Sequence, residues 1–348
     1  MIVFALAALG LVVYELRGFL HLGGFSGEKL LEALREANPY YLILALVAIY
    51  ACYGVRSLRW QVFQRNIGRA NFWKIYKLTL AGFAAIFVLG RAGEPVRPLL
   101  LAKKQDLPIA DTFGIYVLER IFDMGSIAVI TALGLVLFGM QPHNGDLAMQ
   151  LETAAKTTGA ILFAGVLGAT VGLVYMRLHG TALLERRLED AIHGGGWRAT
   201  VARILLGFVR GMQTIRTWKD LVLAVVYSIV HWGVVALCYY WVSHSFTGRL
   251  GAITVWDAPL ILAFSLVGSS IQLPGVGGGS QAGAIIAYTA IFGVEREPAV
   301  AAAMVLWLVT FAGCSAVGVP LLIHEGWGLR ELREMAAEEK KEVAAALD

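Results

Sequence analysis

The sequence predicts an all-α membrane protein with about six full spans and two re-entrant broken-helix hairpins. Composition is the first reason: 58% of the 348 residues are hydrophobic and 16% are charged, whereas soluble domains average about 45–50% apolar and about 25% charged. The second is that apolar runs of membrane-spanning length alternate with segments rich in Lys and Arg. The third is that two apolar runs are interrupted by glycine and proline, and such breaks need cover from protein or water inside a membrane.

Residues 1–155 are predicted to form the first transmembrane half. Ile2 opens an apolar stretch, and Pro39–Leu58 forms a clear span that begins with a proline and two interfacial tyrosines. A basic segment follows, which the positive-inside rule places in the cytoplasm. The next apolar run, within residues 78–101, is too short to cross and has basic residues on both flanks. It is therefore predicted to enter and leave on the cytoplasmic side, before a long span at Thr112–Met140.

Residues 156–323 are predicted to form the second half, with the same series of elements. After a first span, residues 181–219 carry many arginines and are predicted to form two amphipathic helices on the cytoplasmic membrane surface, near anionic lipid. Residues 258–292 contain two short apolar pieces joined by a glycine-rich link, which form either a second re-entrant hairpin or two full crossings. The last span, Val300–Ile323, leads into a tail at 324–348 that is predicted to be cytoplasmic.

The order of elements predicts that the two halves have opposite orientations, because each half crosses the membrane three times. This pattern is typical of an inverted-topology repeat, in which paired broken helices mark the binding site near the bilayer midplane. The two hairpins would enter from opposite sides and meet near the centre. The distribution of Lys and Arg also predicts a multi-pass protein of the cytoplasmic membrane with both termini in the cytoplasm.

The first broken element, Phe87–Leu101, carries charged residues between glycines and prolines. Arg91, Glu94 and Arg97 lie in this stretch. Ionisable groups at membrane depth cost about 2.5–3.5 kcal/mol each on insertion scales and usually mark a pathway or a site. We therefore expect this element to handle an anionic group, with Arg91 and Arg97 as binding residues, because arginine can bind phosphate bidentately.

A second group of polar residues lies inside the span at Thr112–Met140. Its members are Tyr116, Glu119, Arg120 and Asp123. The three charged members lie roughly 10–17 Å into the span, and the group lies largely on one helix face, so the charges must face protein or water. One interpretation is an Arg–carboxylate pair that locks this helix to the first hairpin, with Arg120 partly structural. The other is a polar path for a charged headgroup, and the two can coexist.

Two further segments contribute candidate binding residues. Arg56 and Arg59 end the second span one turn apart, and they either snorkel at the interface or form an entrance that attracts phosphate. The second broken element joins its two apolar pieces through glycine and proline. Its candidate residues are Gln272, Pro274, Gly275 and Gln281. The glycines either expose backbone amides to an anion or allow close helix packing.

No catalytic residue, metal or cofactor is predicted from the sequence. The three cysteines lie in apolar runs without metal-ligand spacing. The glycine-rich link lacks Gly-Lys-Ser/Thr and a preceding strand, so it is not a nucleotide loop. The expected partners are membrane lipids with an anionic headgroup, together with a separately encoded lipid-modifying enzyme, and no nucleic acid is expected.

Four motifs taken together resemble a known family. RSLRW, GRAGEPVRPLLL, LERIFD and QLPGVGGG are similar to the lysylphosphatidylglycerol synthase transmembrane-region family, also called flippase-like integral membrane proteins, over nearly the whole chain. The resemblance implies a bacterial or archaeal inner-membrane protein that moves a phospholipid or a polyprenyl-phosphate-linked headgroup. It implies functional roles for Arg91, Glu94, Arg97, Glu119, Arg120 and Asp123. One departure is Gln281, which stands where the family often has an acidic residue and weakens the expectation of a cationic aminoacyl headgroup.

A lipid transporter, or flippase, is therefore the first functional hypothesis, and a protein without enzymatic activity is expected. A membrane-embedded lipid-modifying transferase and a lipid-binding accessory subunit of such an enzyme are the alternatives. The full synthases of the family carry a large soluble catalytic domain, whereas about two dozen residues follow Ile323 here, which counts against the transferase.

Overall fold

The computed structural model describes residues 35–69, 71–139, 217–269, 272–273 and 277–325, with single positions at 28, 32 and between 157 and 202. Within these residues the chain is helical apart from connecting turns and one short pairing of two strands. Four of the described helices are long and apolar enough to cross a membrane: Pro39–Gln64, Phe72–Leu89, Trp218–His244 and Arg296–His324. The prediction of an all-α polytopic membrane protein is confirmed.

The centre of the fold is an antiparallel pair of long helices, α3 (Pro39–Gln64) and α10 (Trp218–His244). The Asn38 side chain caps the start of α3. The backbone N–H of Asn38 donates to the backbone carbonyl of Ser245, which follows the C-terminus of α10, over 2.8 Å. At the opposite end, Arg65 forms an ion pair with the buried Asp220 in the first turn of α10. The two helices are therefore fastened at both ends.

The first broken element forms a hairpin. Helix α4 (Phe72–Leu89) ends at Gly90, whose φ of 66° breaks the helix, and a 3₁₀ turn at Gly90–Gly93 leads into α5 (Val96–Gln105). The Gln64 side chain at the end of α3 donates to the Gln105 side chain over 2.9 Å, so the hairpin returns to the end of α3 from which it started. The expectation that the apolar run within residues 78–101 is too short to cross does not hold for α4, which has 18 residues because its first turns include part of the basic segment.

The second broken element also turns back on itself. Helix α12 (Ala258–Gly268) is followed by strands β1 (Gln272–Leu273) and β2 (Gly277–Gly278), by α13 (Gly279–Ile286) and by a π-helical turn at Ala287–Ile291. Leu260 packs beside Ile291 and Phe292, so the start and the end of the element lie together. Its first helix has 11 residues, well short of the roughly 20 that a crossing needs, which favours the re-entrant interpretation over two crossings.

The remaining helices connect the two hairpins to the central pair. Helix α6 (Ile109–Gly139) follows the first hairpin and crosses both α10 and α12. Helix α11 (Gly248–Gly251) is a single turn after α10. The last span consists of α14 (Arg296–Trp307), a π-helical turn and α15 (Gly313–His324). Helix α14 packs on α13 and α15 packs on α4, so this one span contacts both hairpins.

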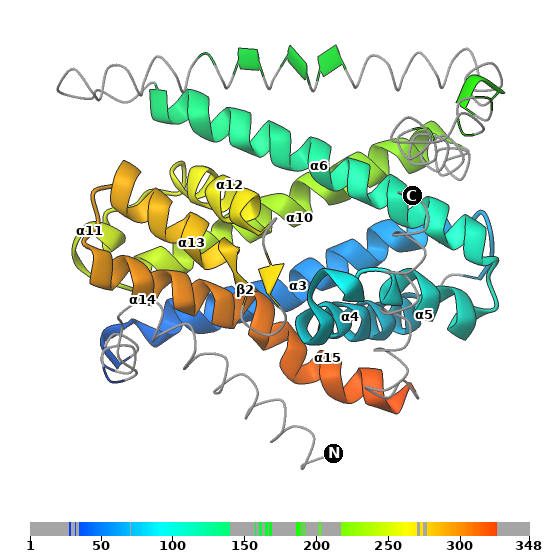
Figure 1. Ribbon diagram of the computed structural model, residues 1–348, viewed down its shortest axis with the longest axis horizontal. Coiled ribbons are helices and arrows are strands. Elements are labelled where there is room, and N and C mark those ends of the chain that lie inside the picture. Colours follow the sequence, from blue (N-terminus) through cyan, green and yellow to red (C-terminus); the bar gives the residue numbers. More distant parts are fainter. Residues whose placement is uncertain are drawn as a thin grey trace.

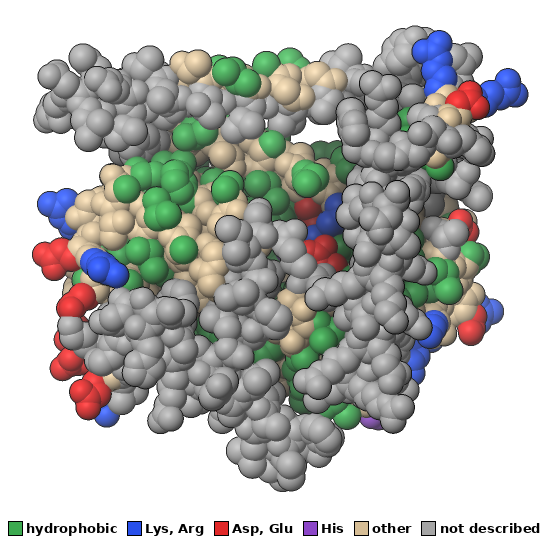
Figure 2. All heavy atoms as spheres, in the orientation of Figure 1, with side chains coloured by type: hydrophobic (Ala, Val, Ile, Leu, Met, Phe, Trp, Pro, Cys, Tyr) green, Lys and Arg blue, Asp and Glu red, His purple; other side chains and the backbone are tan. Residues whose placement is uncertain are grey.

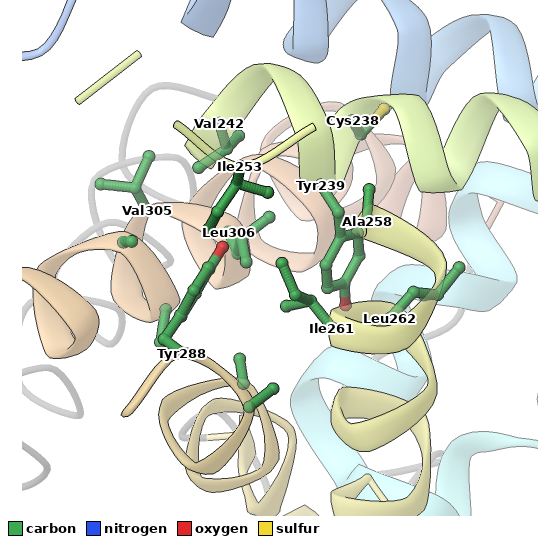
Figure 3. Packing of buried hydrophobic residues seen from close by; sticks show 14 of the residues in the cluster. Cys238, Tyr239, Val242, Ile253, Ala258, Ile261, Leu262, Tyr288, Val305 and Leu306 are labelled. Carbon is green, nitrogen blue, oxygen red and sulfur yellow. The ribbon is translucent and has the colours of Figure 1, made fainter. Parts of the chain in front are cut away.

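The two hairpins lie at opposite ends of the central helix pair (Figure 1). The core beside the first hairpin contains Trp60, Phe63, Ile75, Leu101 and Ala224. The core beside the second contains Ala45, Val242, Ala258, Tyr288 and Val294, and part of it is shown in Figure 3. Their tips meet, since β1 contacts the Gly90–Gly93 turn. This contact between the broken elements was expected, while superposition of the two halves as an inverted repeat stays a prediction.

Several expected segments lie wholly or largely outside the described residues. They are the first apolar stretch, the loop after Met140, the first span of the second half, the amphipathic segment at 181–219 and the tail at 324–348. The division of the chain into halves at residue 155 falls in the same part of the sequence and stays a prediction.

Candidate functional site

Five ionised side chains meet in the interior beside the first hairpin, and we call them the buried charge cluster. They are Arg56 and Arg59 of α3, Arg97 of α5, and Glu119 and Asp123 of α6, each no more than 5% exposed. Helix periodicity explains the convergence: the two arginines of α3 are three residues apart and the two carboxylates of α6 are four apart, so each pair lies on one helix face.

Asp123 is the acceptor with the most partners in the cluster. Its carboxylate pairs with Arg56, accepts from Arg59 Nη2 over 2.7 Å and accepts from the indole Nε1 of Trp232 over 3.2 Å. The donors come from α3 and α10, so one carboxylate of α6 connects three helices. Charge-assisted hydrogen bonds of this kind are about twice as strong as neutral ones.

Glu119 connects the same helices to the hairpin. Its Oε1 lies 3.0 Å from Arg59 Nη2 and 3.1 Å from Arg56 Nε, and its Oε2 lies 2.7 Å from Arg97 Nη1. The expected Arg–carboxylate pair between this helix and the first hairpin is therefore present, formed by Arg97 and Glu119. Because the pair is buried, its desolvation offsets much of the Coulomb attraction.

Arg97 is the cluster member with the fewest hydrogen bonds. Its side chain is 1% exposed, and its Nε and Nη2 have no hydrogen-bond partner among the described residues. The guanidinium lies over the rings of Trp60 and Phe83, with Cζ 4.7 and 5.5 Å from their centroids. Aromatic faces attract the cation but accept no conventional hydrogen bond, so this guanidinium keeps two donor nitrogens for another acceptor.

A glycine sets the position of Arg97 relative to α4. A Cβ added at Gly82 would lie 2.5 Å from the Arg97 Cβ and 2.9 Å from its Cα. The absence of a side chain at this position allows α5 to approach the backbone of α4 closely, which brings the guanidinium between Trp60 and Phe83.

Three partly exposed residues form an outer layer over the cluster: Glu94, Tyr116 and Arg120. The Tyr116 hydroxyl donates to Glu94 Oε2 over 2.8 Å. The Arg120 guanidinium lies 5.3 Å from the Tyr116 ring centroid and 3.3 Å from Asp123 Oδ2. Figure 2 shows acidic and basic side chains exposed together in the middle of this face, beside hydrophobic side chains.

Arg120, which was expected to be partly structural, lies at the edge of the cluster. Its side chain is 36% exposed, and the carboxylate that it touches is already paired with Arg56 and Arg59. Those two arginines were expected to snorkel at the interface or to attract phosphate at an entrance. Their burial instead makes them the internal partners of α6, because α3 and α6 bring opposite charges together away from water.

Two residues of α10 that contact the cluster were not predicted from the sequence. Ser228 accepts from Arg59 Nη1 over 2.7 Å, and Trp232 donates to Asp123. They are four residues apart and thus share a helix face. A serine and a tryptophan at this spacing in an apolar helix are a weak signal, because neither residue is unusual in a membrane span.

The remaining predicted residues are only partly covered by the structure. The side chains of Arg91 and Gln272 lie outside the described atoms, as do Pro274 and Gly275 entirely. The backbone of Gln272 pairs with Gly278. Gln281 lies on α13, is 1% exposed and accepts from the Ser280 hydroxyl over 3.2 Å.

The chemistry of the cluster suits an anion better than a metal ion. Its nitrogen donors come from arginine, which stays protonated in proteins and does not ligate cations. Within the described part of the chain, no group of three His, Cys, Asp or Glu side chains could hold a metal ion.

These features define an integral α-helical membrane protein with a guanidinium-rich cluster beside the meeting point of two broken helices. The chain belongs to the family described as the lysylphosphatidylglycerol synthase TM region, whose model matches residues 2–318. The resemblance noted in the sequence motifs is thereby confirmed.

Three relatives are similar to the chain. A UPF0104 membrane protein of Methanothermobacter thermautotrophicus is 24% identical over 324 residues, covering 86% of this chain and 90% of the relative. Another, of Methanocaldococcus jannaschii, is 30% identical over 100 residues, or 28% of this chain and 30% of the relative. Glycosyltransferase AglD of Haloferax volcanii is 24% identical over 219 residues, or 54% of this chain and 33% of that protein. No solved structure matches the chain.

Proposed function

We propose that this protein is a lipid transporter of a prokaryotic cytoplasmic membrane. It moves a phospholipid or a polyprenyl-phosphate-linked headgroup across the bilayer, with both termini in the cytoplasm. The single observation that carries the proposal is the buried Arg97 guanidinium, whose Nε and Nη2 have no hydrogen-bond partner among the described residues. An unsatisfied buried donor is costly, and a phosphate oxygen is a strong acceptor for it.

The position of Arg97 supports transport rather than passive lipid binding. It lies on the first broken element, whose tip contacts the tip of the second. In transporters with paired broken helices the substrate binds at such a meeting point, and alternating access follows from rocking one unit against the other. A headgroup held here would be reachable from either side as the hairpins move.

Substitution of Arg97 tests the proposal directly. We expect Arg97→Ala to abolish translocation of fluorescent NBD-phosphatidylglycerol in proteoliposomes, measured by dithionite quenching. Arg97→Lys should retain part of the rate, because lysine keeps the charge and loses the bidentate fork. Arg97→Ala should still fold, since Glu119 keeps Arg56 and Arg59 as partners.

The matched control is Arg69→Ala, which removes an exposed arginine outside the cluster. Its translocation rate should equal that of the unaltered protein. An Arg97→Ala variant that folds and moves lipid at the full rate would refute the proposed site. So would unfolding of both Arg97 variants, because the residue would then be needed for structure alone.

A second function is favoured by one comparison. The match to glycosyltransferase AglD covers a third of that protein, so a region similar to this chain is there part of a longer protein with that name. By analogy, this chain would bind a lipid and present it to a separately encoded lipid-modifying enzyme. Proteoliposomes that bind NBD-phosphatidylglycerol through Arg97 without moving it would support this function over transport.

A further inference from the structure

We propose that the buried charge cluster accepts a single negative charge, so that the ligand is a phosphodiester and not a phosphomonoester. This inference rests on the proposed function, because it concerns the lipid that binds at Arg97. It follows from the charge balance of the cluster and from the position of the unpartnered N–H groups.

The charge balance is the first step. The cluster contains three arginines and two carboxylates, and arginine stays protonated in proteins. The described side chains of the cluster therefore carry one positive charge in excess. Uncompensated charge is expensive in a low-dielectric interior, so an entering monoanion would complete the balance. A dianion would leave one buried negative charge without a partner.

The location of the excess charge is the second step. Arg56 and Arg59 each contact both carboxylates. Among the carboxylates of the described residues, Arg97 pairs with Glu119 alone, through one of its three nitrogens. The excess positive charge therefore resides at Arg97, and its remaining Nε and Nη2 can donate to two oxygens of one phosphate group. A phosphodiester has two such unesterified oxygens and one charge.

The outer layer does not change this balance. Glu94 and Arg120 carry opposite charges and both contact Tyr116. Trp60 and Phe83, which face the guanidinium, are neutral. A ligand that entered past Tyr116 would meet no further net charge among the described side chains before it reached Arg97.

The first experiment compares two lipids on the unaltered protein. Binding of dihexanoyl phosphatidylmethanol, a monoanionic diester, and dihexanoyl phosphatidic acid, a monoester, is measured by calorimetry in a neutral detergent. The pH is set above the second pKa of the monoester. We expect the diester to bind at least about tenfold more tightly. Equal binding of the two lipids, or tighter binding of the monoester, would overturn the inference.

A charge variant gives an independent test. Glu119→Gln keeps the shape of the side chain and removes one negative charge, so the excess becomes two. We expect the preference for the diester to fall by at least about tenfold or to reverse, while Arg69→Ala leaves it unchanged. An unaltered preference in folded Glu119→Gln would contradict the charge count. If this variant does not fold, the comparison on the unaltered protein still decides.

Two further measurements separate the possible sources of failure. Dimethyl phosphate carries the same charged group without acyl chains and should bind at least about tenfold more weakly. Binding as tight as that of the lipid would overturn assignment to a lipid. If neither lipid binds and NBD-phosphatidylglycerol is not moved, the proposed function fails. If that lipid is moved but the diester is not preferred, only the charge inference fails.

Discussion

At the scale of single residues, the five cluster side chains are not equivalent. Asp123 receives donors from two arginines and one indole, whereas Arg97 uses one nitrogen and keeps two nitrogens without a hydrogen-bond partner in the described part of the chain. Removing one partner from a satisfied buried network leaves the others uncompensated. Asp123 should therefore matter for folding, and Arg97 for binding.

We predict that Asp123→Ala lowers the free energy of unfolding by about 3–5 kcal/mol, because Arg56 and Arg59 lose a shared buried counter-charge. Melting of the purified protein in detergent measures the effect. Arg120→Ala is the matched comparison, since it removes the partly exposed partner of the same carboxylate. Its cost should be at most about 1 kcal/mol. Equal destabilisation by the two substitutions would contradict the assignment of Arg120 to an outer layer.

At the scale of elements, both hairpins are packed through glycine. In the first, the backbone of Arg97 packs directly against Gly82, and Gly93 lies against the carbonyl of Ala85. In the second, Gly268 lies against Gly279, and Gly283 lies against the carbonyl of Phe264. Small residues at helix contacts allow backbones to approach closely in membranes, where association depends on van der Waals packing. The glycine-packing interpretation of the second broken element agrees with these contacts.

The close approach at Gly82 yields a prediction for the first hairpin. Gly82→Ala should lower the melting temperature and weaken lipid binding, because the added methyl group pushes Arg97 away at a packing cost of about 1–3 kcal/mol. Gly54→Ala in α3 is the matched control, because the nearest side-chain atom would lie 3.9 Å from its Cβ. That control should be neutral or stabilising, since alanine favours helix by about 1 kcal/mol. A Gly82→Ala variant with unchanged melting and binding would disprove this role.

At the scale of the whole molecule, the hairpins start from opposite ends of the antiparallel α3–α10 pair. The first begins and ends beside the Gln64 end of α3, and the second packs against its Ala45 half. Because α3 is long enough to cross a membrane, its two ends belong on opposite sides. This arrangement supports the proposed inverted orientation of the two halves.

Cysteine labelling can test that orientation. In a background without the three native cysteines, Lys74→Cys and Lys103→Cys should react with an impermeant maleimide from one side, and Trp256→Cys and Glu295→Cys from the other. All four positions are exposed. By the positive-inside rule, the first pair should face the cytoplasm. Labelling of positions 74 and 103 from opposite sides would show that the first element crosses the membrane and is not re-entrant.

The sequence by itself determined the class of the molecule and the location of its unusual segments. The long apolar runs predict membrane helices because only helices satisfy their own backbone hydrogen bonds in lipid. The same reasoning identified the two broken elements, since Gly90 and the glycines after Leu273 interrupt apolar helices. Glu119 and Asp123 were also predictable as inward-facing residues, because a carboxylate at that depth cannot face lipid.

Only the tertiary structure decided which charges pair. Arg56, Arg59 and Arg120 were all available to the carboxylates of α6, and helix periodicity does not say which helix lies beside which face. The packing of α10 against α3 brings Ser228 and Trp232 to the cluster. Both residues lie more than 100 positions after Asp123 in the sequence. The unpartnered groups of Arg97 follow from these pairings, because a hydrogen bond depends on distance and direction in space and not on spacing in the sequence.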